Sequence, residues 1–591
     1  MKKTHSLLPR FIVFLAVVMA LLMPATNLFA QENLPLCFTA RGGSVTVQFE
    51  IVNIPHTIQF STDGTSWSTY TSNQEVALDA NQSVYFRAEN NQDSAVAFAD
   101  SAVHSYFDFS CTNGGTVEGS GNIMSLYGPD CPDLPLQPYA FAAMFDGCSS
   151  LTTAPALSAT TLAENCYRQM FYGCTSLTEA PALPATILAD GCYYVMFSTC
   201  TSLMEAPSLP ATILAKDCYC GMFERCSSLT TAPTLPATTL TDYCYYAMFY
   251  DCTSLTRAPS LPAITLADNC YAYMFVRCTS LTEAPALPAT TLADNCYAYM
   301  FAVCTSLTEA PALPAPTLAS KCYYAMFYDC TSLTAASSLS ATTMADSCCH
   351  SMFWGCTSLT TAPSMSATTL AVYCCYCMFY ECSSLTKAPT LPATALESRC
   401  YTHMFQGCTS LTTPPVLPAT TLARSCYNAM FKNCTSLTTV PTLPATTLEY
   451  RCYYAMFEGC TSLIVNEAAP GKQWFIPATE TASGSLTNMF NGTSGTMNGT
   501  PLVNTMYYIA SDPTTAVNDV DNDEMEYVVY SNNRQIFVQG AEGHAITLYD
   551  INGRVVAQTA HADDTQDFTV NTAGIYLVCV DKKSAKKVMV R

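Results

Sequence analysis

The chain has 591 residues, a formal net charge of −21 and a pI near 4.6. An acidic surface repels polyanions, so the charge excludes nucleic acid and anionic membranes as natural partners. Half of the residues are hydrophobic and 11% are aromatic, which excludes a disordered chain. At this length we expect several domains.

Residues 1–30 have the pattern of a secretory signal peptide. Lys2, Lys3 and Arg10 precede an apolar run at 11–23, and Leu28-Phe29-Ala30 offers a cleavage site before Gln31. The run is too short to span a bilayer. The later sequence has no segment of transmembrane character, so we expect an exported protein that is soluble or attached to a surface.

Residues 31–135 are predicted to form a β-rich domain. The stretches at 45–52, 57–60 and 83–88 alternate between apolar and polar residues, and Asp63-Gly64 is a turn signal. This pattern predicts an antiparallel, β-sandwich-like fold. Its role cannot be read from these residues.

Residues 136–500 consist of a repeat of 26 residues. Its clearest mark is a Met-Phe pair that recurs at this constant step in thirteen copies, from Met144 to Met456. A worn copy follows at Met489-Phe490, with Ser485 and Thr493 where cysteines would stand. A fixed period of this size indicates a solenoid, in which each coil buries its apolar side against its neighbours. We expect the worn copy to be a cap.

The two halves of one unit have different periods. Leu266, Cys270, Met274 and Cys278 step by four residues, which predicts a short helix or 3₁₀ segment on the outside of the coil. The other half, at 280–289, contains two prolines, which favour extended geometry. We therefore expect an α/β solenoid with one short strand and one short helix in each coil.

The run Phe171-Tyr-Gly-Cys174-Thr-Ser-Leu177-Thr, repeated at 405–412, resembles the FxGCxxLT core of BspA-like leucine-rich repeats. The resemblance covers roughly residues 140 to 500. It departs from the family where Ala-Pro interrupts the strand before Leu-Pro. The resemblance implies a leucine-rich-type solenoid on a bacterial surface. It also implies adhesion to host extracellular matrix protein, other bacterial cells or glycans.

Residues 501–525 are polar and acidic, which predicts a solvated linker. The Asp-x-Asp-x-Asp run from Asp519 hints at a calcium loop. However, Glu524 stands where such a loop needs glycine, and Tyr530 stands where it needs glutamate. Residues 526–591 contain seven short alternating runs and an Asn552-Gly553 turn, which predict a small β-sandwich.

This last segment resembles the C-terminal sorting domain of type IX secretion substrates. The resemblance rests on the runs at 548–555, 572–578 and 586–591. It implies an address for the type IX secretion machinery, followed by removal of the domain. The expected location is therefore outside the cell, either secreted or on the outer membrane surface of a Gram-negative bacterium.

The 33 cysteines fall mainly into two columns, four residues before and four residues after Met. Export permits disulfides. Cys270 and Cys278 would lie about 12 Å apart on a helix, beyond the roughly 7 Å that a bridge allows. Pairing Cys174 with Cys192 of the next coil stays open. We favour buried thiols packed in two ladders over systematic disulfides.

The sequence contains no H-E-x-x-H, G-x-S-x-G, Walker or G-x-G-x-x-G pattern, so we expect neither an enzyme nor a cofactor. The dense cysteines at Cys348-Cys349-His350 and Cys374-Cys375-Tyr-Cys377 are better explained as ladder residues with neighbouring substitutions than as a metal site. His350 and His403 occupy variable positions and are expected at the surface.

Two columns of variable residues are the candidate binding sites. The first lies eight positions after Phe and is expected on the concave face; its charged members are Glu179, Glu205, Arg257, Glu283, Glu309 and Lys387. The second directly follows Phe and contains aromatic residues expected to be exposed: Tyr172, Tyr250, Tyr328, Trp354 and Tyr380.

Plain solvent exposure would also explain this variability. If the columns bind a protein or glycan partner, the protein is a surface adhesin. The alternative is a stalk that presents the N-terminal domain as the real binder, and a secreted hydrolase is a distant third reading. Charge reversal at Glu283 and Glu309 should separate the first two readings.

Overall fold

The computed structural model describes residues 34–52, 54–100, 102–510 and most of 528–590. In the last range, residues 533, 540, 551–553, 564, 573 and 582–584 are not described. The chain divides into two units between Pro513 and Thr514, and each is treated separately. The predicted signal peptide, the acidic run from Asp519 and the Asn552-Gly553 turn lie outside the described residues.

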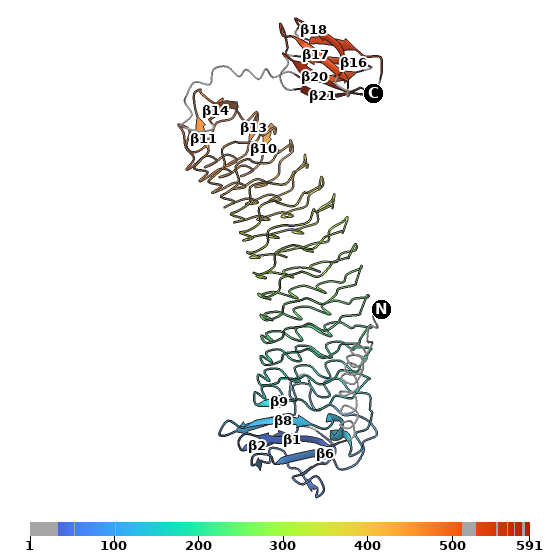
Figure 1. Cartoon of the computed structure of the whole chain (residues 1–591). Coiled ribbons are helices and arrows are strands. Elements are labelled where there is room, and N and C mark those ends of the chain that lie inside the picture. The colour runs from blue at the N-terminus through green and yellow to red at the C-terminus, as the bar shows by residue number, and fades with distance from the viewer. Residues whose placement is uncertain are drawn as a thin grey trace, which may run out of the picture. The chain divides into compact units, whose positions relative to one another are not determined.

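The first unit begins with two β-sheets (Figure 1). Aromatic side chains belong to the core of this region. A six-stranded sheet has the order β4-β3-β6-β1-β8-β9, and a three-stranded sheet has the order β5-β2-β7. The rings of Phe49 and Phe107 stack between them at 4.1 Å. The strands are β1 Leu36–Arg41, β2 Val45–Glu50, β3 Ile58–Ser61, β4 Ser68–Thr69, β5 Val76–Leu78, β6 Ser83–Ala88, β7 Tyr106–Cys111, β8 Thr116–Ser120 and β9 Leu151–Thr153.

This β-rich region shares its hydrophobic core with the first repeat. β8 pairs in parallel with β9, which already belongs to the repeat. The ring of Phe107 stacks on Phe145 at 5.4 Å, and the Cys148 thiol donates a hydrogen bond to the Phe107 carbonyl at 3.1 Å. The 3₁₀ helix η1, Ile123–Tyr127, is buried at the same junction. The N-terminal region is therefore the cap of the repeat stack.

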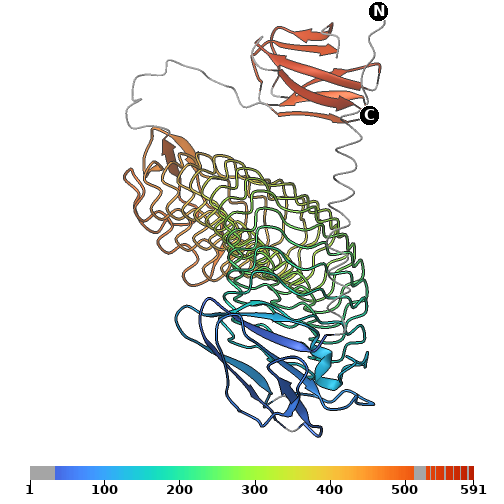
Figure 2. The same ribbon diagram turned by 60° about the horizontal axis from the view of Figure 1, so that its bottom comes forward.

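The repeat region is a solenoid-like stack of coils, which lie one behind another when the first unit is viewed obliquely from its N-terminal end (Figure 2). The predicted helix in each coil is wrong. In its place, the Met170 N–H donates to the Tyr167 carbonyl three residues earlier, while the Phe171 N–H donates to the Met196 carbonyl of the next coil at 2.9 Å. η1 is the sole helical element in the described part of the chain.

A residue with positive φ at every fourth position explains the absence of helix. In the same arc, φ is 56° at Gln169 and 71° at Gly173. A left-handed residue interrupts an α-helix, so alternate N–H groups turn to the neighbouring coil and remain satisfied there. The arc is thus a chain of turns whose period equals the four-residue step of the apolar side chains.

The proline-containing half of the coil forms short parallel pairings. Glu179 bridges to Glu205, and Glu205 bridges to Thr231. Further such bridges join later coils, and most of these segments are too short to count as strands. The prediction of an interrupted ladder is confirmed, because proline lacks the N–H that a continuous ladder needs.

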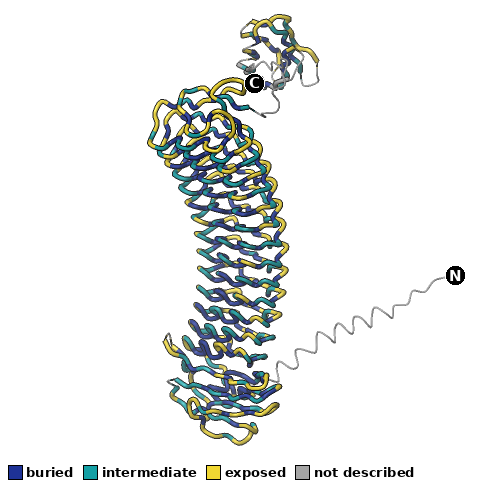
Figure 3. Tube along the Cα trace, turned by 90° about the vertical axis from the view of Figure 1, so that its left-hand side faces the viewer, coloured by how far each residue is buried: buried dark blue, intermediate teal, exposed yellow. Residues whose placement is uncertain are grey.

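Ladders of identical side chains fill the inside of the stack. Phe249 and Phe275 of successive coils stack at 5.6 Å with an interplanar angle of 3°, and Tyr245 and Tyr271 stack at 5.8 Å. The methionine of each coil is fully buried beside them. Figure 3 shows buried and exposed segments alternating along the coils. Each coil therefore finds its apolar partners in the adjacent coils.

All 33 cysteines are free thiols, which confirms the preference for packed thiols over disulfides. In the column that follows Met, each thiol donates to a phenylalanine carbonyl; Cys278, for example, reaches the Phe249 carbonyl at 3.1 Å. Burial raises the pKa of Cys166 and Cys244 to about 12. These thiol hydrogen bonds were not predicted from the sequence.

The worn repeat closes the stack as predicted. Phe490 stacks on Phe457 at 5.5 Å, and Ser485 and Thr493 are buried in the cysteine positions. β14 lies between β11 and β12, so residues 507–510 belong to this cap and not to the linker that we predicted from 501. The strands are β10 Thr447–Leu448, β11 Ile464–Asn466, β12 Lys472–Trp474, β13 Glu480–Thr481 and β14 Tyr507–Ala510.

The second unit contains two antiparallel sheets around one small core. Their orders are β15-β16-β19 and β18-β17-β20-β21. Ile536, Leu548, Val578 and Val588 are among the apolar residues buried in this core. Each of the seven alternating runs has a strand: β15 Val528–Asn532, β16 Gln535–Gln539, β17 Ile546–Asp550, β18 Val555–Thr559, β19 Thr565–Thr569, β20 Gly574–Val580 and β21 Ala585–Val590.

Candidate binding surface

The first predicted column forms a ladder on the extended half of the coils. Parallel bridges link Thr231 to Arg257 and Arg257 to Glu283, and Thr361 to Lys387 farther along. The side chains are exposed at all six charged positions, which are Glu179, Glu205, Arg257, Glu283, Glu309 and Lys387. The constant backbone therefore presents side chains of both charges along the stack, with glutamate repeated in some successive coils. Their role in binding stays a prediction.

Lys387 also lines a hollow of about 590 Å³ on this side of the stack. The other lining residues are small or polar and include Thr334, Thr361 and Pro363. Ser337 stands where Pro363 stands in the next coil. The hollow lies beside this local departure from the Ala-Pro pattern.

The second predicted column is half-buried, so the expectation of exposed aromatic residues is wrong for Tyr172, Tyr250, Tyr328, Trp354 and Tyr380. Three of these rings contact one another across successive coils. Trp354 lies 5.7 Å from Tyr328 and 4.2 Å from Tyr380. They lose exposure because the coil spacing brings neighbouring rings into contact. Tyr172 and Tyr250 lie in other coils, apart from this group.

A longer row of aromatic side chains, which we did not predict, lies on the turn arcs. Neighbouring ring centroids are 4.5 to 5.8 Å apart. Every ring in the row is half-buried. We call it the aromatic row: Tyr246, Tyr273, Tyr299, Tyr324, His350, Tyr376 and His403.

The aromatic row was missed because its members alternate between two sequence positions. Tyr246 and Tyr324 stand two residues before Met, whereas Tyr273 and Tyr299 stand one residue before Met. In these coils alanine takes whichever of the two positions lacks tyrosine. A search for one residue type at a fixed step does not detect such a row. Comparing both positions together would have found it.

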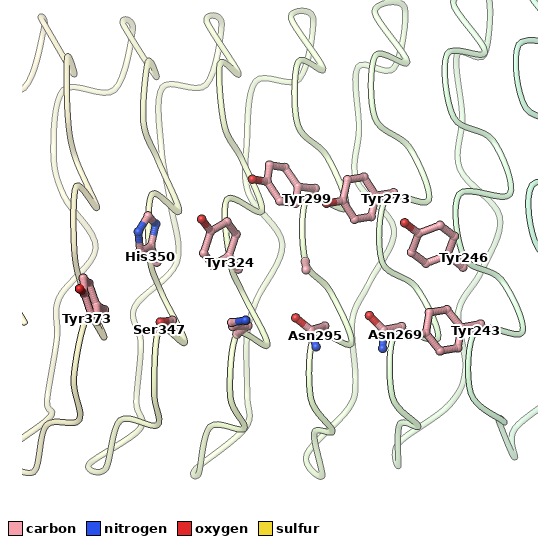
Figure 4. A pocket seen from close by; sticks show the side chains of 12 residues that line it. Tyr243, Tyr246, Asn269, Tyr273, Asn295, Tyr299, Tyr324, Ser347, His350 and Tyr373 are labelled. Carbon is pink, nitrogen blue, oxygen red and sulfur yellow. The ribbon is translucent and has the colours of Figure 1, made fainter.

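A second row of mostly polar residues runs beside the aromatic row (Figure 4). Its members share one position, directly before a ladder cysteine, and all have φ between 53° and 57°. Asparagine tolerates this left-handed conformation better than most residues. We call it the polar row: Tyr243, Asn269, Asn295, Lys321, Ser347 and Tyr373.

The two rows border an open hollow of about 650 Å³. Burial raises the pKa of Tyr246 to about 12, so its hydroxyl stays protonated at neutral pH and can donate a hydrogen bond. Figure 4 shows the rings of Tyr246, Tyr273, Tyr299 and Tyr324 succeeding one another along the hollow. The arrangement suits contact with an extended ligand that crosses several coils.

His350 and His403 belong to the aromatic row, so they lie at the surface as predicted but are half-buried between neighbouring side chains. His350 stacks between Tyr324 at 4.5 Å and Tyr376 at 4.7 Å. Desolvation lowers the pKa of His350 to about 4, and it also lowers the pKa of His403. Both rings are therefore neutral at pH 7.

Within the described residues, no three His, Cys, Asp or Glu side chains are grouped so that they could hold a metal ion. Cys348, Cys349, Cys374, Cys375 and Cys377 are all buried. The part of the chain that the structure describes also has no helix of the length and apolarity needed to cross a membrane.

Comparison with known families gives two matches. A model described as "BspA type Leucine rich repeat region" matches residues 141–256, 196–334, 249–386 and 320–464, which together cover 141–464. Residues 514–590 match a family described as a domain of unknown function, DUF6383. A search of curated proteins finds no match to this chain.

Proposed function

Since the chain belongs to the family of BspA-type leucine-rich repeat proteins, we propose that it is a non-enzymatic surface adhesin that binds proteins or glycans. One observation carries this proposal: a constant coil presents exposed side chains whose charge varies along the stack, as at Arg257, Glu309 and Lys387. Solenoids commonly bind partners through such extended surfaces. The partners proposed are host extracellular matrix protein, other bacterial cells or glycans.

We further propose that the protein is exported and displayed on a Gram-negative cell surface. The signal pattern of residues 1–30 supports export. The C-terminal unit would be the address for type IX secretion, as its resemblance to sorting domains implies. Its match to a family of unknown function carries no information about secretion.

Attachment of beads coated with the full chain to immobilised matrix proteins, bacterial cells and glycans tests the adhesin. Glu283→Lys with Glu309→Lys reverses two exposed charges on the ladder, and we expect it to weaken attachment by about tenfold, through changed electrostatic complementarity. Thr413→Ala is the matched control at the same position in another coil. Equal attachment by all three proteins would contradict a role for this ladder.

A further inference from the structure

We propose that the hollow between the aromatic row and the polar row binds an arginine-rich segment of a partner protein. The proposal rests on the interaction function proposed above and names the ligand class for one face. It depends on ring contacts within the chain, on the distribution of charge around the hollow, and on the length of the row.

The chain itself places guanidinium groups on tyrosines beside the hollow. Arg168 lies over the ring of Tyr194 at 4.4 Å to its centroid, and Tyr194 occupies the same coil position as Tyr246. Arg399 lies over Tyr373, the last member of the polar row, at 5.3 Å. Both distances are within the range of cation–π attraction. Tyrosines on this face of the stack are thus already partners for arginine.

Three tyrosines of the aromatic row within the hollow lack such a cation, whereas Tyr373 at its end has Arg399. Of the described arginines and lysines, none lies over the rings of Tyr273, Tyr299 or Tyr324. These rings are half-buried and contact one another at 4.8 and 5.4 Å. Arg168 reaches Tyr194 from the same position of the preceding coil, a place that a neighbouring ring takes in the row, so an arginine of a partner would reach these rings from the open side of the hollow. Because the row continues over several coils, an extended segment could place several side chains along it.

The charge beside the hollow favours a cationic ligand. Asp242, Asp268 and Asp294 each directly precede a member of the polar row and are exposed. One carboxylate oxygen of each accepts an N–H from the next coil at 3.0 to 3.2 Å. The other oxygen faces no such backbone donor and can pair with a guanidinium. These aspartates adjoin the lining residues but are not part of the lining, in which Lys321 is the cation; its single charge offsets part of the three negative charges.

An uncharged glycan is less suited to this site. Tyrosine rings and asparagine amides could contact sugars, but the carboxylates would add nothing to binding of a neutral chain. Anionic glycans and nucleic acids would be repelled by the aspartates and by the net charge of −21. A basic peptide uses the rings and the carboxylates together.

Fluorescence anisotropy of a labelled Arg-Ser repeat peptide with the full chain tests the proposal. Equal-length Lys-Ser and Glu-Ser peptides and cellohexaose are the comparison ligands. Two double variants probe the site: Tyr299→Ala with Tyr324→Ala, and Asp268→Asn with Asp294→Asn. Alanine is native to both tyrosine positions, at Ala247 and Ala298, so the first variant should fold. Asparagine retains the oxygen that accepts the N–H, so the second removes only charge.

We expect the Arg-Ser peptide to bind most tightly, because a planar guanidinium stacks on rings better than an ammonium does. Each double variant should weaken it by at least about tenfold. Tyr508→Ala, in the C-terminal cap and outside the hollow and both predicted columns, should have no effect. Absence of peptide binding would overturn the proposal. Peptide binding that is weakened by the aspartate substitutions but not by the tyrosine substitutions would also overturn it, because that result indicates general charge attraction. Binding of cellohexaose that depends on the tyrosines, in place of peptide binding, would overturn it as well.

The bead assay separates failure of this proposal from failure of the adhesin. Bead attachment could be lost with Glu283→Lys and Glu309→Lys but unchanged in the tyrosine double variant. That result would support the adhesin function and contradict a role for the hollow in attachment. Wild-type beads that attach to nothing would overturn the adhesin itself, whatever the peptide does.

Discussion

A buried thiol that donates to a main-chain carbonyl is the recurrent residue-scale feature of this protein. The carbonyl of Phe249 accepts both the Cys252 N–H and the Cys278 thiol of the next coil. The thiol thereby links two coils without a covalent bond. Because the thiolate is the reactive form, the raised pKa of these buried groups also protects them from oxidation and alkylation.

Thiol labelling tests this account of the cysteines. With iodoacetamide in the absence of reductant, we expect Cys111 to react first in the native protein, because it is half-buried whereas the other cysteines are buried. In guanidinium chloride, still without reductant, all 33 should react. Mass spectrometry counts the adducts. Cysteines that stay unlabelled until a reductant is added would show disulfides instead.

His350 predicts a pH dependence of stability. Its pKa is about 4 in the folded protein against an ordinary value of 6.5. Between these values the unfolded chain binds the proton more tightly, so stability should fall as pH drops from 6.5 to 4 and this contribution should level off below 4. His350→Tyr supplies the residue found at Tyr324 and Tyr376 and does not titrate in this range. Urea unfolding should show a shallower loss in the variant; identical pH profiles would contradict the lowered pKa.

At the scale of the element, the coil is set by a left-handed residue at every fourth position of the turn arc. Gln169 and Gly173 have positive φ in one coil, and Tyr273 and Arg277 do in another. The energy of these conformations is offset by regular hydrogen bonds to the next coil and by the Phe and Tyr stacks. No single coil has these partners alone, so the coil depends on its neighbours.

The sequence predicted the features that follow from strict spacing. The 26-residue step indicated the stack and the Glu179-to-Lys387 ladder, and the worn Met489-Phe490 copy beyond the last regular repeat indicated the cap. It did not predict the turn arc, because a helix and a chain of turns place Cys270, Met274 and Cys278 on the same face at the same step. It also missed the aromatic row, because a tyrosine one residue earlier or later reaches the same place on the surface.

Deleting coils should show how strictly the ladders define the element. Removing residues 267–292 joins Leu266 to Ala293 and restores the repeat in register, so this variant should fold with nearly unchanged thermal stability. Removing only 267–279 puts Ser280 after Leu266 and breaks every ladder at that point. We expect aggregation or a strongly lowered unfolding temperature, measured by circular dichroism. Equal stability of the two deletions would contradict ladder packing.

At the scale of the whole molecule, the N-terminal sheets and the repeats form one core. Phe107 of the sheets stacks on Phe145 of the first coil, and β8 pairs with β9. Separating residues 31–135 from 136–500 would expose this junction, so the two binding regions should be compared in the intact chain. This continuity bears on the alternative hypothesis that the repeats are a stalk, because the N-terminal domain that the stalk would present is itself part of the stack.

Hydrogen exchange of the intact chain, with and without the target found in the bead assay, is the most direct test of the central claim that the repeats are the binding surface. We predict that protection gained on binding maps to the repeat coils, on the Glu179-to-Lys387 ladder or the aromatic row. Residues 34–120 should exchange at unchanged rates. Protection confined to 34–120 would contradict the claim and identify the repeats as a stalk.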